Sequence, residues 1–221
     1  MDMVPSKKAF GRPMNWGSTY TNWTEKRTRK LTNILGPEWF PGKRVLDVGC
    51  GHGNNGKFLQ SLGSQVVFTD ARAQYIEQLL ADGCDARIMD NDKEWTVDGP
   101  FDLIVHWGLL YHLDNWKSDL RHAIARFPLI CLECTIASSS NPTYEEKPLE
   151  PTSTGQDHAF NGVGTILSSQ HLENYVTELG CSYTRYDSPE LNEAVHNYSW
   201  EESGEGYIHG HRRFWMIRKD A

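Results

Sequence analysis

The sequence predicts a single α/β domain over residues 1–221, with a doubly wound, mostly parallel sheet of seven strands whose last strand runs antiparallel. Three observations support this fold. The 221 residues are 38% hydrophobic and 23% charged, which suits one globular domain with a core. Strand-like apolar runs alternate with amphipathic stretches, as in βαβ units. The two C-terminal strands have no convincing helix between them, so we expect them to pair antiparallel.

The seven expected strands share short apolar runs bounded by glycine or polar turns. They lie at 43–48, 65–69, 86–89, 101–105, 128–134, 182–186 and 211–218. The expected helices, which carry apolar residues at helical spacing, lie at 54–62, 72–82, 115–126 and 166–179, the last of them stopped by Gly180. Residues 101–105 are almost all apolar, so this strand should be covered on both faces and lie centrally in the sheet.

Residues 1–40 form an N-terminal segment with an aromatic stripe. Trp16, Tyr20 and Trp23 are spaced by four and three residues, which places them on one face of a helix. Such a stripe is typical of a core or docking face. The alternative is that an aromatic ring, Tyr20 in particular, contacts a bound ligand.

Two irregular segments, 136–165 and 188–210, are longer than ordinary connections. Each follows the C-terminal end of an expected strand, and open α/β sheets bind ligands at that edge. We therefore expect both segments to cover a substrate. The alternative is that they are solvated surface loops without function.

Composition and charge exclude several classes of function. A net charge of -7 disfavours sequence-independent binding of a phosphate backbone. The first twenty residues do not resemble a secretory signal, and no run reaches membrane-spanning length, so no membrane partner is expected. Five cysteines without a tight framework suit a reducing, cytoplasmic compartment. Cys131 and Cys134 should point to opposite faces of a strand, so no metal site is predicted.

The most informative stretch runs from Val45 to Gly56, where a strand leads directly into closely spaced glycines and then a helix. Glycines let the backbone approach a ligand where a side chain would clash. A G-x-G-x-x-G match within this stretch raises a dinucleotide alternative. However, Asp47 lies two residues before Gly49, and a carboxylate at the mouth of the turn would repel a pyrophosphate. It would attract the ammonium and sulfonium of S-adenosylmethionine (SAM).

Asp70 ends the second expected strand about 20 residues after the glycines, where an acidic group usually accepts hydrogen bonds from ribose hydroxyls. Each carboxylate also has a structural alternative. Asp47 could cap the turn, and Asp70 could cap the N-terminus of the next helix. Their order along the chain favours a nucleoside ligand.

Four ordered motifs, LDVGCGHG, FTDA, IMDND and FDLIVHWGLLYHL, resemble those of class I SAM-dependent methyltransferases over about residues 43–135. The family's fold has a seventh strand antiparallel at the sheet edge, in agreement with the expected fold. The resemblance implies that SAM is the cofactor and S-adenosylhomocysteine its product. It also implies a set of cofactor contacts: Asp47, Gly49, Gly51 and Gly53 around the methionine part, Asp70 at the ribose, and Met89 with Asp90 at the adenine, where Asp92 competes with Asp90. We add Cys50, Ala71, His106, Trp107 and Tyr20 as further candidates.

Catalysis of methyl transfer is mainly a matter of positioning, because the reaction is an in-line displacement with a good leaving group. For a hydroxyl acceptor, a general base is a candidate further requirement. His112 and His158 are the preferred candidates, since both follow the C-terminal ends of strands at the ligand edge. His106 is expected to line the cofactor pocket. The alternative for each histidine is a structural hydrogen-bonding role.

Three functions compete. The leading prediction is methylation of a hydroxyl or amine on a small molecule, sugar or metabolite. The second is an RNA-modifying enzyme, because GLLYH is similar to the corresponding loop of wobble-uridine modification enzymes; the acidic charge disfavours it. The third is a SAM-binding regulator without catalysis. The loop after the fourth strand lacks the Asn/Asp-Pro-Pro-aromatic signature, a Pro-Cys nucleophile and a metal-binding aspartate, which disfavours DNA base methylation and magnesium-dependent chemistry.

Overall fold

The computed structural model describes residues 18–150 and 158–220, with side chains from residue 22 onward. Its seven-stranded sheet has the order β3-β2-β1-β4-β5-β9-β8. The strands are β1 (Arg44–Val48), β2 (Gln65–Asp70), β3 (Asp85–Ile88), β4 (Leu103–Trp107), β5 (Leu129–Thr135), β8 (Cys181–Arg185) and β9 (Arg212–Lys219). β9 runs antiparallel to both β5 and β8, and the other pairings are parallel. The predicted fold class is therefore confirmed, but the antiparallel strand β9 lies between β5 and β8 and not at the edge of the sheet as expected.

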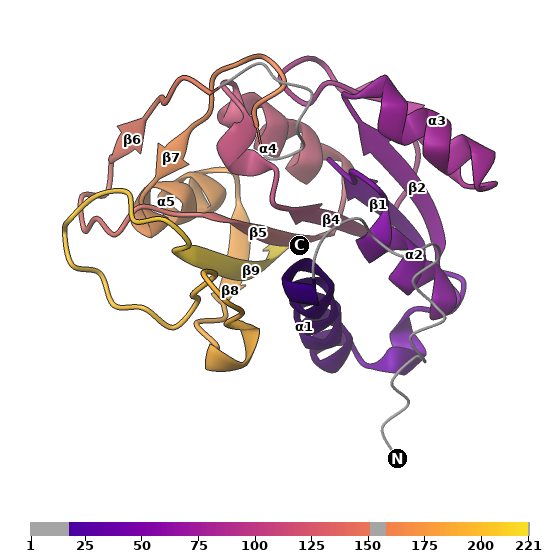
Figure 1. Cartoon of the computed structure of the whole chain (residues 1–221), viewed down its shortest axis with the longest axis horizontal. Helices are drawn as coiled ribbons and strands as arrows, with labels where there is room; N and C mark the ends of the chain where they lie inside the picture. The colour runs from indigo at the N-terminus through magenta and orange to yellow at the C-terminus, as the bar shows by residue number, and fades with distance from the viewer. Residues whose placement is uncertain (1–17, 151–157, 221) are drawn as a thin grey trace.

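Helices cover both faces of this sheet. They are α1 (Ser18–Leu35), α2 (Asn54–Ser61), α3 (Ala73–Ala81), α4 (Trp116–Arg126) and α5 (Ser169–Glu178). Buried side chains of α1, α2 and α3 form one apolar cluster, and those of α4 and α5 form the other. Figure 1 shows α1 and α4 on opposite sides of β4. As predicted, β4 is buried over its whole length between these layers.

The chain around α5 differs from the prediction in one respect. The helix begins at Ser169, and Ile166–Leu167 instead form a short strand, β7, which pairs antiparallel with β6 (Glu145–Glu146). The side chain of Ser168 caps the helix by accepting a hydrogen bond from the backbone N–H of His171 at 3.1 Å. The apolar spacing of 166–179 continues through the strand, so periodicity alone does not mark this boundary.

The sheet separates the two cysteines of the CxxC as expected. Cys131 packs with the α1 side of the sheet and Cys134 with the α4 side. Within the described part of the chain, no three His, Cys, Asp or Glu side chains are grouped as metal ligands, and no helix has the length and apolar character needed to cross a membrane.

Candidate functional site

Two adjoining cavities open at the carboxyl ends of β1, β2 and β4. They share Gly49, Asp70, Arg72 and Gly108, so they form one continuous cleft. The first cavity contains about 500 Å³ of empty space, part of it open to solvent, and is lined by Gly49, Asp70, Ala71, Arg72, Asp90, Asn91, Asp92, Gly108, Leu109, His112, Leu113, His158 and Phe160.

The second cavity is larger, with about 730 Å³ of empty space, and it extends beneath α1. Its lining residues are Trp23, Thr24, Arg27, Gly49, Cys50, Gly51, His52, Asn54, Asn55, Asp70, Arg72, Tyr75, Trp107, Gly108, Tyr111, His196 and Arg212. The two cavities therefore combine acidic loops at one end with aromatic and basic side chains at the other.

The glycine turn forms the wall common to both cavities. Gly49, Gly51 and Gly53 have φ values of 60°, 53° and 73°, a left-handed conformation that strongly favours glycine. A Cβ on Gly49 would come within 2.9 Å of the Leu109 side chain. Gly49, Cys50 and Gly51 line the cleft as predicted, whereas Gly53 packs against Leu79 and lines neither cavity.

Asp70 lies where the two cavities meet. One carboxylate oxygen accepts a hydrogen bond from the backbone N–H of Gly51 and the other from that of Arg72, both at 2.9 Å. The side chain thereby ties the glycine turn to the end of β2 while facing the cleft. Burial raises its pKa, and the two N–H bonds act in the opposite direction. Ala71, beside it, lines the first cavity.

Asp47 differs from the prediction in its position. It is not at the mouth of the turn but is 1% exposed, and its carboxylate accepts a hydrogen bond from the backbone N–H of Gly56 at 2.9 Å. It lines neither cavity, and its hydrogen bond to Gly56 holds the first turn of α2 in place. Burial raises its pKa to about 7, with the charge of Asp70 adding to the rise and the Gly56 bond and Arg27 acting against it.

The buried Asp47 predicts a pH-dependent stability. Because its folded-state pKa lies above the unfolded value of about 3.9, its contribution is fully present below pH 4 and is lost as pH rises toward 7. Relative to Asp47→Asn, which keeps an acceptor for Gly56, the wild-type protein should lose up to roughly 1.4 kcal/mol of unfolding free energy per pH unit in this window. Urea unfolding of both proteins between pH 4.5 and 8 measures this difference. If the unfolding free energies of the two proteins changed with pH in the same way, the raised pKa of Asp47 would be contradicted.

The loop after β3 lines the first cavity with Asp90, Asn91 and Asp92, while Met89 is buried and lines neither cavity. Asn161 donates to Asp92 at 3.0 Å and to Asp90 at 3.4 Å, which links this loop to the segment 158–165. The structure therefore brings both competing carboxylates, Asp90 and Asp92, to the same cavity.

Asp119 on α4 holds this loop from behind. Its buried carboxylate accepts hydrogen bonds from Asn91 at 2.7 Å and from the indole N–H of Trp95 at 3.0 Å, and it contacts His106 at 2.7 Å. His106 is fully buried in this network and lines neither cavity, in contrast to the prediction. It faces α4 because side chains alternate along β4, whereas its neighbour Trp107 lines the second cavity as predicted.

His112 and His158 both line the first cavity. His112 Nδ1 lies 2.9 Å from Glu150 Oε2, which also accepts a hydrogen bond from the backbone N–H of Ala159. Burial alone would raise the pKa of Glu150, but the contacts with His112 and Ala159 lower it. Sequence reasoning missed Glu150, which lies 38 residues from its partner in an irregular segment. Asp157, the neighbour of His158, lies outside the described residues.

The second cavity contains a buried ion-pair network that the sequence did not reveal. Glu133 on β5 is fully buried and accepts hydrogen bonds from Arg27 of α1 and Arg212 of β9. The hydroxyl of Tyr198 donates to the same carboxylate at 2.9 Å. Burial would raise the pKa of Glu133, but Arg212, Arg27 and Tyr198 outweigh it and hold the pKa below its usual value. The cluster fixes α1 against the sheet.

Trp23, from the predicted aromatic stripe, is buried beside this network. Its ring stacks on His196 at a centroid distance of 3.8 Å, and its indole N–H donates to Tyr198. It both packs in the core and lines the second cavity. Trp16 and the side chain of Tyr20 lie outside what the structure describes, so the cofactor contact of Tyr20 stays a prediction.

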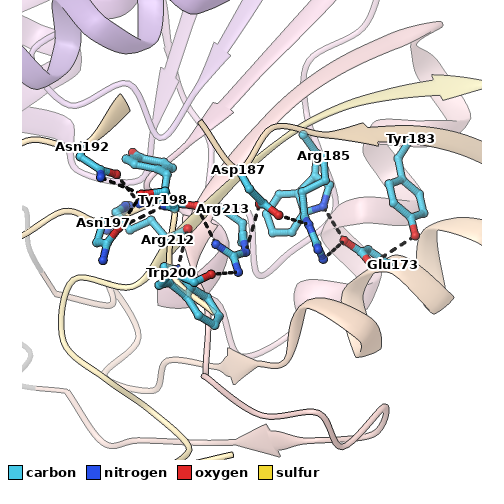
Figure 2. Close-up of polar contacts among 12 residues, drawn as sticks. Glu173, Tyr183, Arg185, Asp187, Asn192, Asn197, Tyr198, Trp200, Arg212 and Arg213 are labelled. Atoms are coloured by element: carbon cyan, nitrogen blue, oxygen red, sulfur yellow. Dashed lines mark hydrogen bonds and ion pairs between the residues drawn. The ribbon is translucent and has the colours of Figure 1, made fainter. Parts of the chain in front are cut away.

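Arg213 anchors the segment 188–210 through the contacts drawn in Figure 2. Its guanidinium donates to the backbone carbonyl groups of Tyr198 and Trp200 and lies 3.2 Å from Asp187. Ser138 and Gly206 exchange backbone hydrogen bonds, which join the irregular segment 136–165 to the irregular segment 188–210. Both segments reach the cleft: His158 and Phe160 line the first cavity, and His196 lines the second.

Comparison with known proteins identifies the class that this fold and site define. Residues 20–186 match the Methyltransferase domain family, and the chain belongs to that family. This confirms the predicted class, a SAM-dependent methyltransferase with SAM as cofactor. One relative is protein-L-isoaspartate O-methyltransferase of Hahella chejuensis (strain KCTC 2396), 32% identical over 83 residues. That match covers 34% of this chain and only 39% of the relative.

Solved structures share the fold. The N-terminal domain of EvdMO1, crystallised in the presence of S-adenosylhomocysteine and D-fucose, has a TM-score of 0.64 and 17% identity, with 93% of this chain and 85% of that chain covered. Magnesium protoporphyrin IX methyltransferase from Synechocystis PCC 6803 has a TM-score of 0.61 and 11% identity, with 96% and 92% covered. A SAM-dependent methyltransferase from Mesorhizobium loti has a TM-score of 0.61 and 16% identity, with 87% and 98% covered.

Proposed function

We propose that this enzyme transfers the methyl group of SAM to a hydroxyl or amine of a small molecule. The observation that supports this proposal is the pair of joined cavities, one acidic and the other aromatic and basic. The first suits the nucleoside of the cofactor and the second leaves room for an acceptor. One structurally similar protein was crystallised in the presence of D-fucose and another is a magnesium protoporphyrin IX methyltransferase, which supports an acceptor of small size.

The described residues fit SAM by their chemistry. Asp70 would accept hydrogen bonds from the ribose hydroxyls, and Asp90 or Asp92 from the adenine amino group. The backbone of Gly49 to Gly51 offers a surface without large side chains for the amino-acid part. When bound, SAM supplies a methyl group on a cationic sulfur, so the protein's own part is to hold the acceptor in line and to exclude water.

For a hydroxyl acceptor we propose His112 as the base, oriented by Glu150. Its position in the first cavity makes an adenosine contact the competing role, and kinetics separate the two. As a base, His112→Ala should lower kcat roughly 100-fold with the KM for SAM within twofold of wild type. A raised KM for SAM with an unchanged kcat would contradict the base assignment. His209→Ala, at an exposed histidine, is the matched control. His158 stays a second candidate.

The experiment that tests the proposed function is an acceptor screen with SAM labelled on the methyl carbon. Purified protein is incubated with a metabolite extract, a panel of hydroxyl and amine compounds, and total RNA. We expect label in low-molecular-mass products. Label in RNA alone would overturn the small-molecule assignment in favour of RNA modification. Binding of SAM without transfer to any of these acceptors would favour the non-catalytic regulator. The cytoplasmic location stays a prediction.

A further inference from the structure

The second cavity carries more positive charge than its lining can balance. Arg27, Arg72 and Arg212 line it, with Asp70 as the only carboxylate among its described lining residues. Glu133 lies behind Arg27 and Arg212, so two guanidinium groups share one carboxylate. This local excess contrasts with the net charge of -7 for the whole chain. Charges buried without a partner are costly, which points to an anion that completes the site.

Arg27 also lacks a hydrogen-bond acceptor for one of its nitrogen atoms. Its side chain is 5% exposed, and one of its terminal nitrogens contacts Glu133 at 3.2 Å. Its buried Nε has no hydrogen-bond partner. The guanidinium carbon lies 3.7 Å from the ring centroid of Trp23 and 5.2 Å from that of Trp107. A buried donor without an acceptor is rare in native structures and indicates a missing partner.

We propose that the methyl acceptor is an organic acid whose carboxylate binds at Arg27 and Arg212. This inference rests on the proposed function and names the substrate class. A planar carboxylate can accept hydrogen bonds from a guanidinium group. Arg27 offers the unpartnered Nε, whereas Arg212, whose nitrogens already donate to Glu133 and Thr135, contributes its positive charge. The cofactor brings one carboxylate but two cationic groups, its sulfonium and its ammonium, so its net charge is still positive and an anionic acceptor lowers the electrostatic cost of binding both. Arg27 and Arg212 come from α1 and β9, outside the glycine turn and the loops after β2 and β3 that form the cofactor end.

The aromatic walls of the cavity suggest the probe. Benzoate carries a carboxylate on an apolar ring, and benzamide is its neutral counterpart of nearly the same shape. Protein saturated with S-adenosylhomocysteine is titrated calorimetrically with each compound. We expect benzoate to bind at least about tenfold more tightly than benzamide, since charge-assisted hydrogen bonds supply the difference. Arg27→Gln should remove most of this preference and Arg27→Lys part of it. Arg29→Gln, at an exposed position of the same helix, should leave it unchanged.

Two results would overturn the proposal. The first is equal binding of benzoate and benzamide by wild-type protein that binds S-adenosylhomocysteine normally. The second is a tenfold loss of S-adenosylhomocysteine affinity in Arg27→Gln with unchanged affinity for 5′-methylthioadenosine, because Arg27 would then hold the cofactor's own carboxylate. If wild-type protein failed to bind S-adenosylhomocysteine at all, the proposed function would fail first, so the two failures are distinguishable.

Discussion

Replacing Asp70 with alanine is expected to weaken S-adenosylhomocysteine binding by at least about 100-fold, or roughly 2.7 kcal/mol. The carboxylate has two roles that alanine cannot fill. It accepts hydrogen bonds from the backbone N–H groups of Gly51 and Arg72, and these bonds hold the turn in shape. It also faces the cleft where ribose hydroxyls would bind. Loss of a charged acceptor from a buried site typically costs more than loss of a neutral one.

Calorimetric titration of wild-type and Asp70→Ala proteins measures this effect. Asp85→Ala is the control, because Asp85 is an exposed carboxylate at the start of β3, outside both cavities. Asp70→Asn, which keeps one acceptor oxygen, should give an intermediate loss. Near-normal affinity in a folded Asp70→Ala protein would show that the nucleoside does not bind at this end of the cleft.

The largest loss of stability is expected for Glu133→Ala. The substitution leaves the guanidinium groups of Arg27 and Arg212 buried without their shared carboxylate and also removes the acceptor of Tyr198. Breaking a buried ion pair by removing one partner typically costs about 3–5 kcal/mol. Urea unfolding measures the change, and Glu178→Ala, at an exposed glutamate of α5, is the control. A loss below about 1 kcal/mol would contradict the assigned role.

The same carboxylate predicts a pH dependence of opposite sign to that of Asp47. The folded-state pKa of Glu133 lies below its unfolded value of about 4.3, so its contribution is present above that pH and is lost as the pH falls through the folded-state pKa. Wild-type protein should therefore lose stability relative to Glu133→Gln on acidification below about pH 4.

The sequence predicted those parts of the site that are built from residues close together in the chain. The strand, turn and helix around Gly49 are contiguous, and this pattern is enough to bring Gly49, Gly51 and Asp70 to the cleft, whereas Gly53 lies outside it. Asp47 and His106 differ from prediction because the direction of a strand side chain depends on which helix packs on each face. Sequence order alone does not give that packing.

The residues that sequence reasoning missed act through distant partners. Arg27 is 106 positions from Glu133, and Arg212 is 79 positions from it. Lone arginines and glutamates at such separations resemble solvated surface residues until the fold brings them together. The charge excess of the second cavity is therefore a property of the tertiary structure, whereas the cofactor end could be predicted from its motifs.

Titration of the purified protein with S-adenosylhomocysteine beside NAD tests whether the cleft binds a SAM-type nucleoside. We predict micromolar binding of S-adenosylhomocysteine and no measurable binding of NAD, because Asp70, Asp90 and Asp92 outnumber the one arginine of the first cavity, Arg72, and would repel a pyrophosphate there. Preference for NAD, or no binding of S-adenosylhomocysteine, would contradict this account.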